Sequence, residues 1–408
     1  MKRLQAYKFE LMPNGQQQRQ MRRFAGSCRF VFNRALAEQK TWYEADKSNK
    51  FSYVKLANLL PSWKKELPWL LEAPSQALQQ AIKDLEKAYK NFFARRSSFP
   101  RFKKRSDASG FRFPQGFKID EGNARIFLPK LGWLRYRKSR SVQGRPCNVT
   151  VSSRAGRWYI SIQTEREVEV PVPAVTSSIG IDMGIARFAT LSDGSFWAPV
   201  SSFKQHEIRL ARYQRAMSRK QKGSKNWLKA KRRVQRQHSK IANVRNDFLH
   251  KASSAIVKAH STIVIEDLKI RNMSRSAKGT LESPGRNVRA KSGLNKSILD
   301  QGWFEFRRQL EYKTAWCGGE LIAVNPMNTS RTCPKCGHVS ADNRKTQAVF
   351  CCIGCGHLAH ADHVGAINIL ARGHRVAACG EVVRHKNAVG SCAASVKQEP
   401  TEALALTG

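Results

Sequence analysis

The sequence predicts a multidomain α/β protein, and three observations support this fold class. Extended segments with alternating side chains occupy residues 1–12 and 111–172, and helical patterns fill the stretch between them. Short apolar strands and long helices follow in the second half, together with a cysteine-rich segment. A chain of 408 residues, 41% of them hydrophobic, suffices for roughly two to four domains with ordinary cores.

The chain is strongly basic. It contains 73 Lys and Arg residues against 30 Asp and Glu residues, which gives a formal net charge of +43. A compact protein with this excess repels itself unless a polyanion offsets the field. Because the charges are spread along most of the chain, we expect an extended nucleic-acid-binding surface whose affinity depends strongly on salt.

The sequence gives no indication of export or of a membrane segment. The first residues are basic, but no apolar region follows them, and no run reaches the length of a spanning helix. We therefore expect a cytoplasmic, nucleoid-associated protein of a bacterium or archaeon. In that compartment, the ten cysteines indicate metal binding and not disulfides.

The N-terminal half is expected to form a small β-barrel with a helical insertion. Strand 1–12 completes the barrel, while residues 16–46 and 52–95 are helical in pattern. Residues 94–106 form a basic linker in which Phe99 and Phe102 are positioned to stack on unpaired bases. A plain helical bundle with solvated charges is the alternative for this helical region. The remaining barrel strands are predicted at 125–128, 133–136, 147–151 and 158–163.

The second half begins with an apolar run that carries one acid, Asp182, followed by a second run ending at the turn 192–194. This pattern predicts a tight hairpin at the edge of a sheet. Two basic helices are expected over 203–260 and a buried strand over 261–268. A mobile loop over 271–296, a helix over 297–316, a strand over 321–324 and a disordered tail after about residue 373 are expected to follow.

Four cysteines have the spacing of a zinc ribbon. Two C-x2-C pairs are separated by 15 residues, and a glycine follows each pair. Tetrahedral thiolate coordination suits a structural Zn²⁺ ion. Cys351 could replace its neighbour only by breaking the C-x2-C geometry. The expected ligands are Cys333, Cys336, Cys352 and Cys355.

Three acids lie at the ends or starts of predicted elements: Asp182 in a strand, Glu266 at the end of another strand, and Asp362 at a helix start. Each has a plainer interpretation, as a turn residue or a helix cap. Only a fold could unite residues so far apart, and an RNase H-like α/β core offers this combination of elements. Such a cluster would bind two Mg²⁺ ions for phosphodiester hydrolysis.

In these segments the chain resembles TnpB proteins, transposon-encoded RNA-guided DNA nucleases related to type V CRISPR effectors. The resemblance covers most of residues 1–373. No single matching segment is specific, but the joint presence of the segments and their order along the chain are. The segments are GSCRFVFN (26–33), AYKNFF (88–93), FPRFKKR (99–105), LPKLG (128–132), GIDMGI (180–185), IVIEDL (263–268), GWFEFRRQLEYKTAWCGG (302–319), TSRTCPKCG (329–337) and CCIGCGHLAHADHVGAINI (351–369).

The resemblance implies a domain plan. It comprises a wedge β-barrel (1–14 and 106–174), a helical recognition lobe (15–105), a RuvC-like nuclease (175–325 and 359–375), a zinc ribbon that binds the target nucleic acid (326–358), and a disordered tail (376–408). The three acids match the family's Mg²⁺-binding catalytic residues. The nucleic-acid-binding candidates in this sequence are Arg29, Arg101, Lys103, Lys104 and Arg105.

The implied activity is cleavage of double-stranded DNA that pairs with a guide RNA from the transposon end, beside a short target-adjacent motif. The protein is expected to act as a monomeric ribonucleoprotein. The final family motif, Asp-Arg-Asp followed one residue later by Asn, is altered here to His360, Ala361, Asp362 and Val364. This departure keeps open an RNA-guided repressor with a decayed nuclease. A strand-transfer transposase is the third possibility.

Overall fold

A computed structural model describes residues 1–105 and 109–378 of the chain. The chain divides into two compact units. Unit 1 contains Met1–Val172 and Val200–Leu249, and unit 2 contains Pro173–Pro199 and the chain from His250 onward. Among the described residues, no helix is both long enough and apolar enough to cross a membrane.

Unit 1 is built on a four-stranded antiparallel sheet with the order β1-β7-β6-β2. As expected, the N-terminal strand joins this sheet, and a second sheet, β3-β4-β5, meets it at the Leu11–Tyr136 bridge. Both sheets contribute to one apolar core. The strands are β1 (Lys2–Leu11), β2 (Ser109–Phe113), β3 (Lys118–Asp120), β4 (Arg125–Leu128), β5 (Gly132–Arg135), β6 (Arg145–Arg154) and β7 (Arg157–Glu167).

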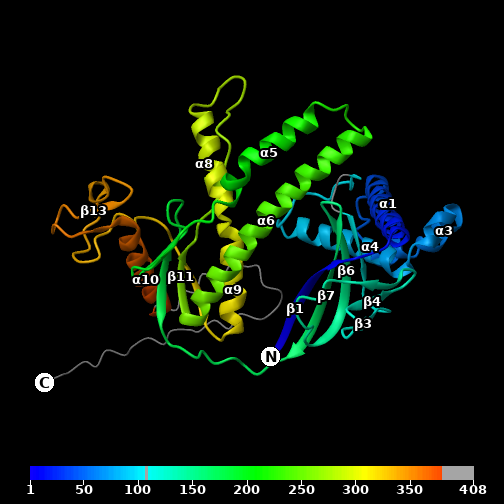
Figure 1. Ribbon diagram of the computed structural model, residues 1–408, viewed down its shortest axis with the longest axis horizontal. Coiled ribbons are helices and arrows are strands. Elements are labelled where there is room, and N and C mark those ends of the chain that lie inside the picture. The colour runs from blue at the N-terminus through cyan, green and yellow to red at the C-terminus, as the bar shows by residue number, and fades with distance from the viewer. Residues whose placement is uncertain (106–108, 379–408) are drawn as a thin grey trace. The chain divides into compact units, whose positions relative to one another are not determined.

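Helices inserted between β1 and β2 pack on this sheet in unit 1 (Figure 1). Helix α1 begins with a reciprocal cap, in which Asn14 Oδ1 accepts the Gln17 N–H and Gln17 Oε1 accepts the Asn14 N–H. Phe24 on α1 meets Phe111 on β2 at 5.7 Å between ring centroids. The helices are α1 (Gly15–Ala45), α2 (Tyr53–Ala57), α3 (Leu60–Glu66), the 3-10 helix η1 (Pro68–Glu72) and α4 (Ser75–Phe93).

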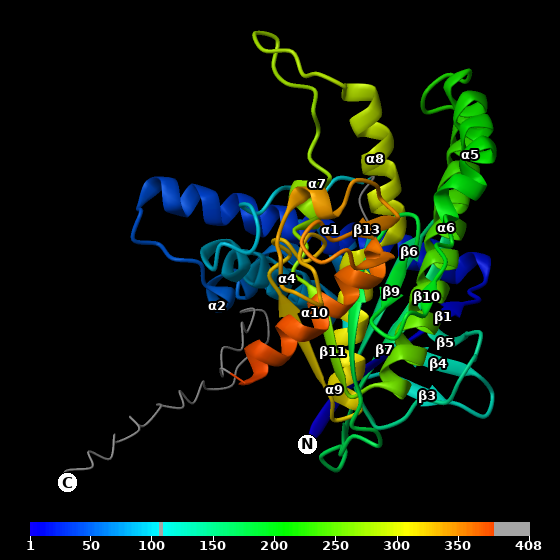
Figure 2. The ribbon, with the colours of Figure 1, turned by 90° about the vertical axis from the view of Figure 1, so that its left-hand side faces the viewer.

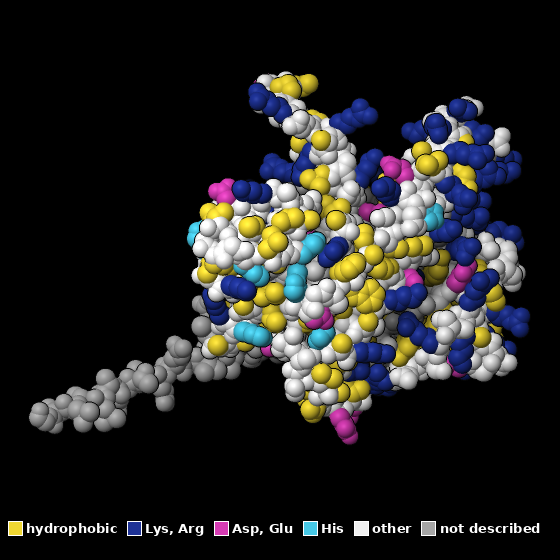
Figure 3. Space-filling view, turned by 60° about the vertical axis from the view of Figure 1, so that its left-hand side comes forward, with side chains coloured by type: hydrophobic (Ala, Val, Ile, Leu, Met, Phe, Trp, Pro, Cys, Tyr) yellow, Lys and Arg dark blue, Asp and Glu magenta, His cyan; other side chains and the backbone are white. Residues whose placement is uncertain are grey.

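Two further helices, α5 (Ser202–Ser218) and α6 (Lys225–Ala259), confirm the predicted basic pair. Leu210 on α5 packs against Val234 and Ile241 on α6. On the face that Figure 3 shows, many Lys and Arg side chains gather over the region of these helices. A narrow apolar stripe therefore holds the two helices together, and the C-terminal part of α6 buries a second set of residues, among them Leu249, Ala252 and Ile256.

Unit 2 contains a five-stranded sheet with the order β10-β9-β8-β11-β12. β11 pairs in parallel with both β8 and β12. β9 pairs antiparallel with β8, and β10 pairs antiparallel with β9. β8 is therefore the central strand, and its predicted position at the sheet edge was wrong. Six residues also separate β8 from β9, so the connection is not a tight hairpin. The strands are β8 (Ser178–Asp182), β9 (Ala189–Leu191), β10 (Phe196–Trp197), β11 (Thr262–Glu266) and β12 (Glu320–Val324).

The helices of unit 2 correct two predictions. α8 (Val288–Gln301) begins inside the segment that was predicted to be a loop, and it is separated from α9 (Trp303–Trp316) by Gly302 in a left-handed conformation. A short helix, α7 (Ile270–Met273), precedes them. Helix α10 (Ala361–Ala378) extends beyond the residue where the tail was expected to begin. The remainder of the predicted tail lies outside the described residues.

Between β12 and α10 the chain forms a small ribbon with the 3-10 helix η2 (Ala341–Asn343) and the paired strands β13 (Val349–Cys351) and β14 (Leu358–His360). α10 then returns to the five-stranded sheet and packs on β8, β11 and β12 (Figure 2). Helix α10, the last helix of the described residues, therefore covers a face of the sheet that includes β8, the strand that carries Asp182.

Candidate active site and cysteine centre

Two of the three predicted acids end neighbouring parallel strands. Asp182 is the last residue of β8, and Glu266 is the last residue of β11. The register pairs Ile181 with Ile265, so Asp182 and Glu266, the next residue of each strand, lie side by side at the same end of the sheet. Because side chains alternate along a strand, both carboxylates point to one face.

Helix α10 lies unusually close to that face. A Cβ atom on Gly180 of β8 would lie 2.2 Å from the Ala366 carbonyl oxygen of α10. A Cβ atom on Gly373 of α10 would lie 2.4 Å from a methyl carbon of Val264 on β11. Only glycine permits both approaches. They bring the first turn of α10, which carries Asp362, toward the ends of the two acidic strands.

Contacts at the start of α10 place this turn next to Asp182. A Cβ atom on Gly365 would lie 3.0 Å from Asp182 Oδ2, so glycine also permits the carboxylate to approach the helix. His360 Nδ1 accepts the backbone N–H of Asp362 at 3.2 Å, as a capping residue does. His363 Nε2 lies 3.1 Å from the Ser192 carbonyl oxygen, which ties the helix to the turn after β9. His363 thus has a structural partner.

Burial and neighbouring charges shift the pKa values of Asp182 and Glu266. The pKa of Asp182 is raised to about 7, first by burial and then by the charges of Glu266 and Asp362, while Arg344 opposes the shift. Burial also raises the pKa of Glu266, against the effects of Thr329, Arg372 and Arg344. Removal of water and mutual repulsion both disfavour three charged carboxylates in one place.

Two residues that sequence reasoning missed contact these acids. Thr329 Oγ1 lies 2.6 Å from Glu266 Oε1, and Arg344 Nη2 lies 3.1 Å from Asp362 Oδ1. Both side chains come from the segment between β12 and α10. In the sequence Thr329 belongs to an ordinary turn, and Arg344 is one of many arginines. Only the tertiary fold distinguishes them.

The donor set fits hard divalent cations. Burial and the charges of Glu266 and Asp362 raise the pKa of Asp182, and a bound cation would relieve this unfavourable charge. Oxygen ligands of this kind suit Mg²⁺. The three acids are not packed as tightly as the thiols described next. Looser packing suits two ions about 3.5–4 Å apart, because the three carboxylates then need not meet around a single point.

The four predicted cysteines form a compact cluster. The Sγ atoms of Cys333, Cys336, Cys352 and Cys355 all lie within 4.8 Å of one another. The Cys333–Cys355 and Cys336–Cys352 separations are 3.6 and 3.5 Å. A tetrahedral site with Zn–S bonds of about 2.3 Å needs sulfur atoms about 3.8 Å apart. The geometry therefore fits a zinc ion held by four thiolates.

The neighbouring cysteine does not belong to the cluster. Cys351 lies exposed on β13, whereas Cys352 is buried, which resolves the ambiguity left by the sequence. Cys28 is buried in unit 1, where its thiol donates to the Ala77 carbonyl oxygen at 3.4 Å. Cys147 and Cys317 also lie outside the cluster, and Cys379 and Cys392 are beyond the described residues.

Family profiles match three parts of the chain. A "Probable transposase" profile matches residues 161–277, and a "Cas12f1-like, TNB domain" profile matches residues 303–369. A "Helix-turn-helix domain" profile matches residues 1–48, where the structure has strand β1 followed by the single helix α1.

A relative in Escherichia coli K12, named "Putative RNA-guided DNA endonuclease InsQ", is 58% identical over 410 residues, which is 100% of each chain. This chain belongs to the TnpB family. Another TnpB relative, from Streptomyces pristinaespiralis, bears the name "Putative RNA-guided DNA endonuclease" and is 36% identical, covering 98% of this chain and 97% of its own.

A solved structure shares the fold of this TnpB chain. A chain in the "Cas12f1-sgRNA-target DNA complex" superposes with a TM-score of 0.55 at 17% identity, covering 85% of this chain and 81% of its own. This likeness shows a common mixed α/β fold.

The altered final motif of this TnpB protein has structural explanations. Val364 and Ala361 are buried against the ribbon, where they pack with Phe350 and the zinc-site cysteines Cys333 and Cys352. His360 supplies the hydrogen bond at the helix start. The substitutions thus join α10 to the ribbon, and they leave Asp362 in the carboxylate cluster.

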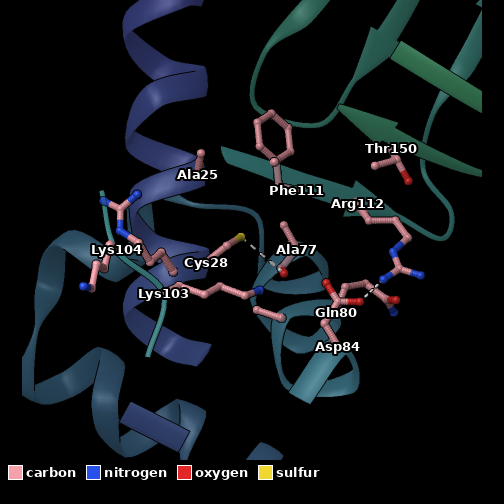
Figure 4. A pocket seen from close by; sticks show the side chains of 13 residues that line it. Ala25, Cys28, Ala77, Gln80, Asp84, Lys103, Lys104, Phe111, Arg112 and Thr150 are labelled. Atoms are coloured by element: carbon pink, nitrogen blue, oxygen red, sulfur yellow. Dashed lines mark hydrogen bonds and ion pairs between the residues drawn. The ribbon is translucent and has the colours of Figure 1, made fainter. Parts of the chain in front are cut away.

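In unit 1, three of the five basic candidates line one pocket of about 240 Å³ (Figure 4). Arg29 of α1 lies there with Lys103 and Lys104, and Arg112 of β2 forms an ion pair with Asp84 on the opposite wall. A reciprocal pair of hydrogen bonds between the Lys103 backbone and the Asn33 amide, at 2.7 and 3.0 Å, holds the 99–105 segment on α1.

The other two basic candidates, Arg101 and Arg105, lie exposed in the same segment and do not line the pocket. Phe99 packs edge-on against Tyr89 and Phe92, and Lys40 lies over the rings of Phe99 and Phe102. Both rings are nevertheless more than 40% exposed. Their faces therefore remain partly accessible for stacking.

Proposed function

We propose that this TnpB-family protein is an RNA-guided DNA endonuclease. It cleaves double-stranded DNA that pairs with a guide RNA from the transposon end, next to a short target-adjacent motif. One observation carries the proposal: Asp182 and Glu266 end the neighbouring strands β8 and β11, Asp362 lies in the first turn of α10, and burial together with the charges of Glu266 and Asp362 raises the pKa of Asp182. The printed names of the relatives support the same activity.

The topology supports the proposed domain plan. An order in which a parallel trio, β8-β11-β12, is extended by antiparallel β9 and β10 is what an RNase H-like core of the RuvC type requires. The two sheets of unit 1 supply the strands of the proposed wedge barrel, and α1 to α4 supply the recognition lobe. The boundaries expected from the sequence are retained as part of this proposal.

In the proposed reaction, the carboxylates of Asp182, Glu266 and Asp362 hold two Mg²⁺ ions. When bound, the ions activate a water molecule and neutralise charge on the phosphodiester. The protein's own contribution is positional. β8 and β11 fix the carboxylates of Asp182 and Glu266 at the same end of the sheet. Helix α10 covers one side of them, and Arg344, a residue of the ribbon, donates a hydrogen bond to Asp362.

The proposed partners are a guide RNA and a target DNA. A chain of similar fold has been solved as a Cas12f1-sgRNA-target DNA complex. The basic pocket of Arg29, Lys103 and Lys104 and the exposed Arg101 and Arg105 supply contacts to phosphates. The four-cysteine ribbon, with structural Zn²⁺, is proposed to bind the target nucleic acid. Monomeric assembly remains a prediction.

Guided cleavage of plasmid DNA by the protein and its copurified RNA tests this proposal. We expect Mg²⁺-dependent cutting at a site complementary to the RNA, and Asp182→Ala should abolish cutting while target binding persists. Asp342, an exposed acid on η2, provides the matched control, and Asp342→Ala should cut normally. Cutting that survives Asp182→Ala would overturn the site assignment.

The altered motif favours a second candidate, an RNA-guided DNA-binding repressor with a weakened nuclease. The observation behind it is the replacement of the expected acid, arginine and asparagine by His360, Ala361 and Val364. In this case the same assay would show guided target binding without cleavage at any Mg²⁺ concentration. Absence of copurified RNA would count against both candidates.

A further inference from the structure

The turn between β12 and the first zinc-site cysteine, residues 325–332, is held by helix α10. Asn368 Nδ2 donates to the carbonyl oxygens of Thr329 and Thr332 at 2.8 and 2.7 Å. Arg372 Nη1 donates to the carbonyl oxygens of Asn325 and Met327. Both anchoring side chains belong to the helix that carries Asp362. The position of this turn is therefore tied to the position of the third acid.

Within this turn, Thr329 contacts the second acid. Its side chain is almost fully buried, and its Oγ1 lies 2.6 Å from Glu266 Oε1 and 3.0 Å from the Pro326 carbonyl oxygen. A hydroxyl group has one hydrogen to donate, and the shorter contact is to the carboxylate. This bond fixes one oxygen of Glu266 and thereby the direction of the other.

The same segment leads directly into the cysteine centre. Cys333 follows Thr332, and the buried Cys333 and Cys352 pack on Ala361 and Val364, which flank Asp362. Asn343 of the ribbon donates to the Arg331 carbonyl oxygen at 2.9 Å, which holds the end of the turn from the other side. A change in the cysteine cluster therefore affects the turn through the direct chain connection at Cys333 and through the packing and hydrogen bonds of the ribbon.

We propose that Thr329 is a positioning residue that couples the cysteine centre to the carboxylate site. With the four thiolates gathered, the turn is fixed, and the Thr329 hydroxyl holds Glu266 in the orientation that binds a divalent cation. The proposal rests on the proposed function only in requiring that the three carboxylates bind such a cation. Coupling of this kind is reciprocal, so occupancy of either centre strengthens the other.

Binding of Mn²⁺, a paramagnetic substitute for Mg²⁺, to the full-length zinc-loaded protein tests the proposal by electron paramagnetic resonance. Thr329→Val keeps the side-chain shape but removes the hydroxyl, and it should weaken Mn²⁺ binding about tenfold, the size expected for one hydrogen bond to a charged group. Thr329→Ser retains the hydroxyl and should restore affinity to within about twofold of the wild type.

Thr332→Val is the matched control. The Thr332 hydroxyl lies in the same turn but donates to the Asn328 carbonyl oxygen at 2.8 Å, and it contacts no carboxylate among the described residues. This variant should bind Mn²⁺ like the wild type. Substitution of Co²⁺ for zinc reports on the cysteines, and its visible absorption should be the same in all three threonine variants.

A double-mutant cycle tests the coupling itself. Cys336→Ser removes one exposed thiolate ligand and should also weaken Mn²⁺ binding. Thr329→Val added to Cys336→Ser should cause little further loss, because both changes act through the same turn. Full additivity would overturn the coupling.

The remaining outcomes separate this inference from the proposed function. Wild-type affinity in Thr329→Val, or an equal loss in Thr332→Val, would overturn the positioning role while leaving the nuclease assignment intact. Mn²⁺ binding that does not depend on Asp182 would instead show that the carboxylate site is misassigned, and both conclusions would fail together.

Discussion

At the scale of single residues, Asp182 makes the stability of the metal-free protein depend on pH. Its pKa is raised to about 7, whereas an aspartate in an unfolded chain titrates near about 4. The folded chain therefore binds more protons between these values, and the free energy of unfolding falls as the pH rises from about 4 to about 7. The loss attributable to Asp182 is at most about 4 kcal/mol.

Asp182→Asn removes this titration, so its thermal midpoint should decline less steeply over that pH range. Glu266, whose pKa is also raised, keeps part of the decline in the variant. Thermal denaturation without added Mg²⁺, at a series of pH values, measures the difference. Asp342→Asn, which removes an exposed acid, serves as the control. Identical pH profiles for the wild type and Asp182→Asn would contradict the prediction.

The residues of the site differ in how far the sequence reveals them. The cysteine ligands follow from local spacing, because a C-x2-C pair already points two sulfur atoms the same way. Asp182 and Glu266 stand out as acids on otherwise apolar strands. Thr329 and Arg344 give no such signal, because their partners lie in distant parts of the chain and the contacts exist only after folding.

At the scale of elements, the close packing of α10 on β8 depends on Gly180. A methyl group at this position would overlap the backbone carbonyl of Ala366, which no side-chain rotation can relieve. Gly180→Ala should therefore destabilise the protein by about 1–3 kcal/mol, the usual cost of overpacking. It should also weaken divalent-cation binding, because α10 carries Asp362. Chemical denaturation and Mn²⁺ titration measure the two effects.

Gly293 of α8 offers the opposite case. A Cβ atom there meets nothing within 4 Å, and the residue lies inside a helix. Gly293→Ala should stabilise the protein by about 0.5–1 kcal/mol, because alanine loses less backbone entropy than glycine. Equal stability of the two alanine variants would show that α10 is free to shift away from β8.

The elements themselves were predicted well where periodicity is local, and poorly where long-range pairing decides. The strands ending in Asp182 and Glu266 were both expected, but the central position of β8 results from its parallel pairing with β11, about 80 residues away. Residues 288–296 of α8 were predicted as a loop because the first turns of this helix are largely polar, and its only buried apolar residue is Ile298. Tertiary packing, and not propensity, stabilises such a helix.

At the scale of the whole molecule, the net charge of +43 should dominate RNA affinity. Binding constants should fall steeply with salt, since each neutralised phosphate releases counterions. Arg29→Gln and Lys104→Gln should each weaken binding about equally for all sequences and lower the salt slope by about one. Filter binding with the cognate RNA over a range of NaCl concentrations measures the slope.

Arg34 provides the comparison for this test. Its guanidinium already pairs with Glu66 at 2.6 Å and lies over the Trp63 ring, so its charge is partly neutralised within the protein. Arg34→Gln should change the slope less than Arg29→Gln does. If all three substitutions gave the same change in slope, the pocket of Arg29, Lys103 and Lys104 would have no special part in binding.

The placement of Asp362 on α10 also sets an order of events during translation. Chains emerge from the ribosome with the N-terminus first, and α10 is the last helix of the described chain. A nascent chain that lacks α10 carries Asp182 and Glu266 but not the third acid or the helix that covers them. The basic residues of unit 1, by contrast, are already made. On the proposed function, RNA would therefore meet the basic residues of unit 1 before the three acids are all present, and the nascent chain would bind RNA before it could cut DNA.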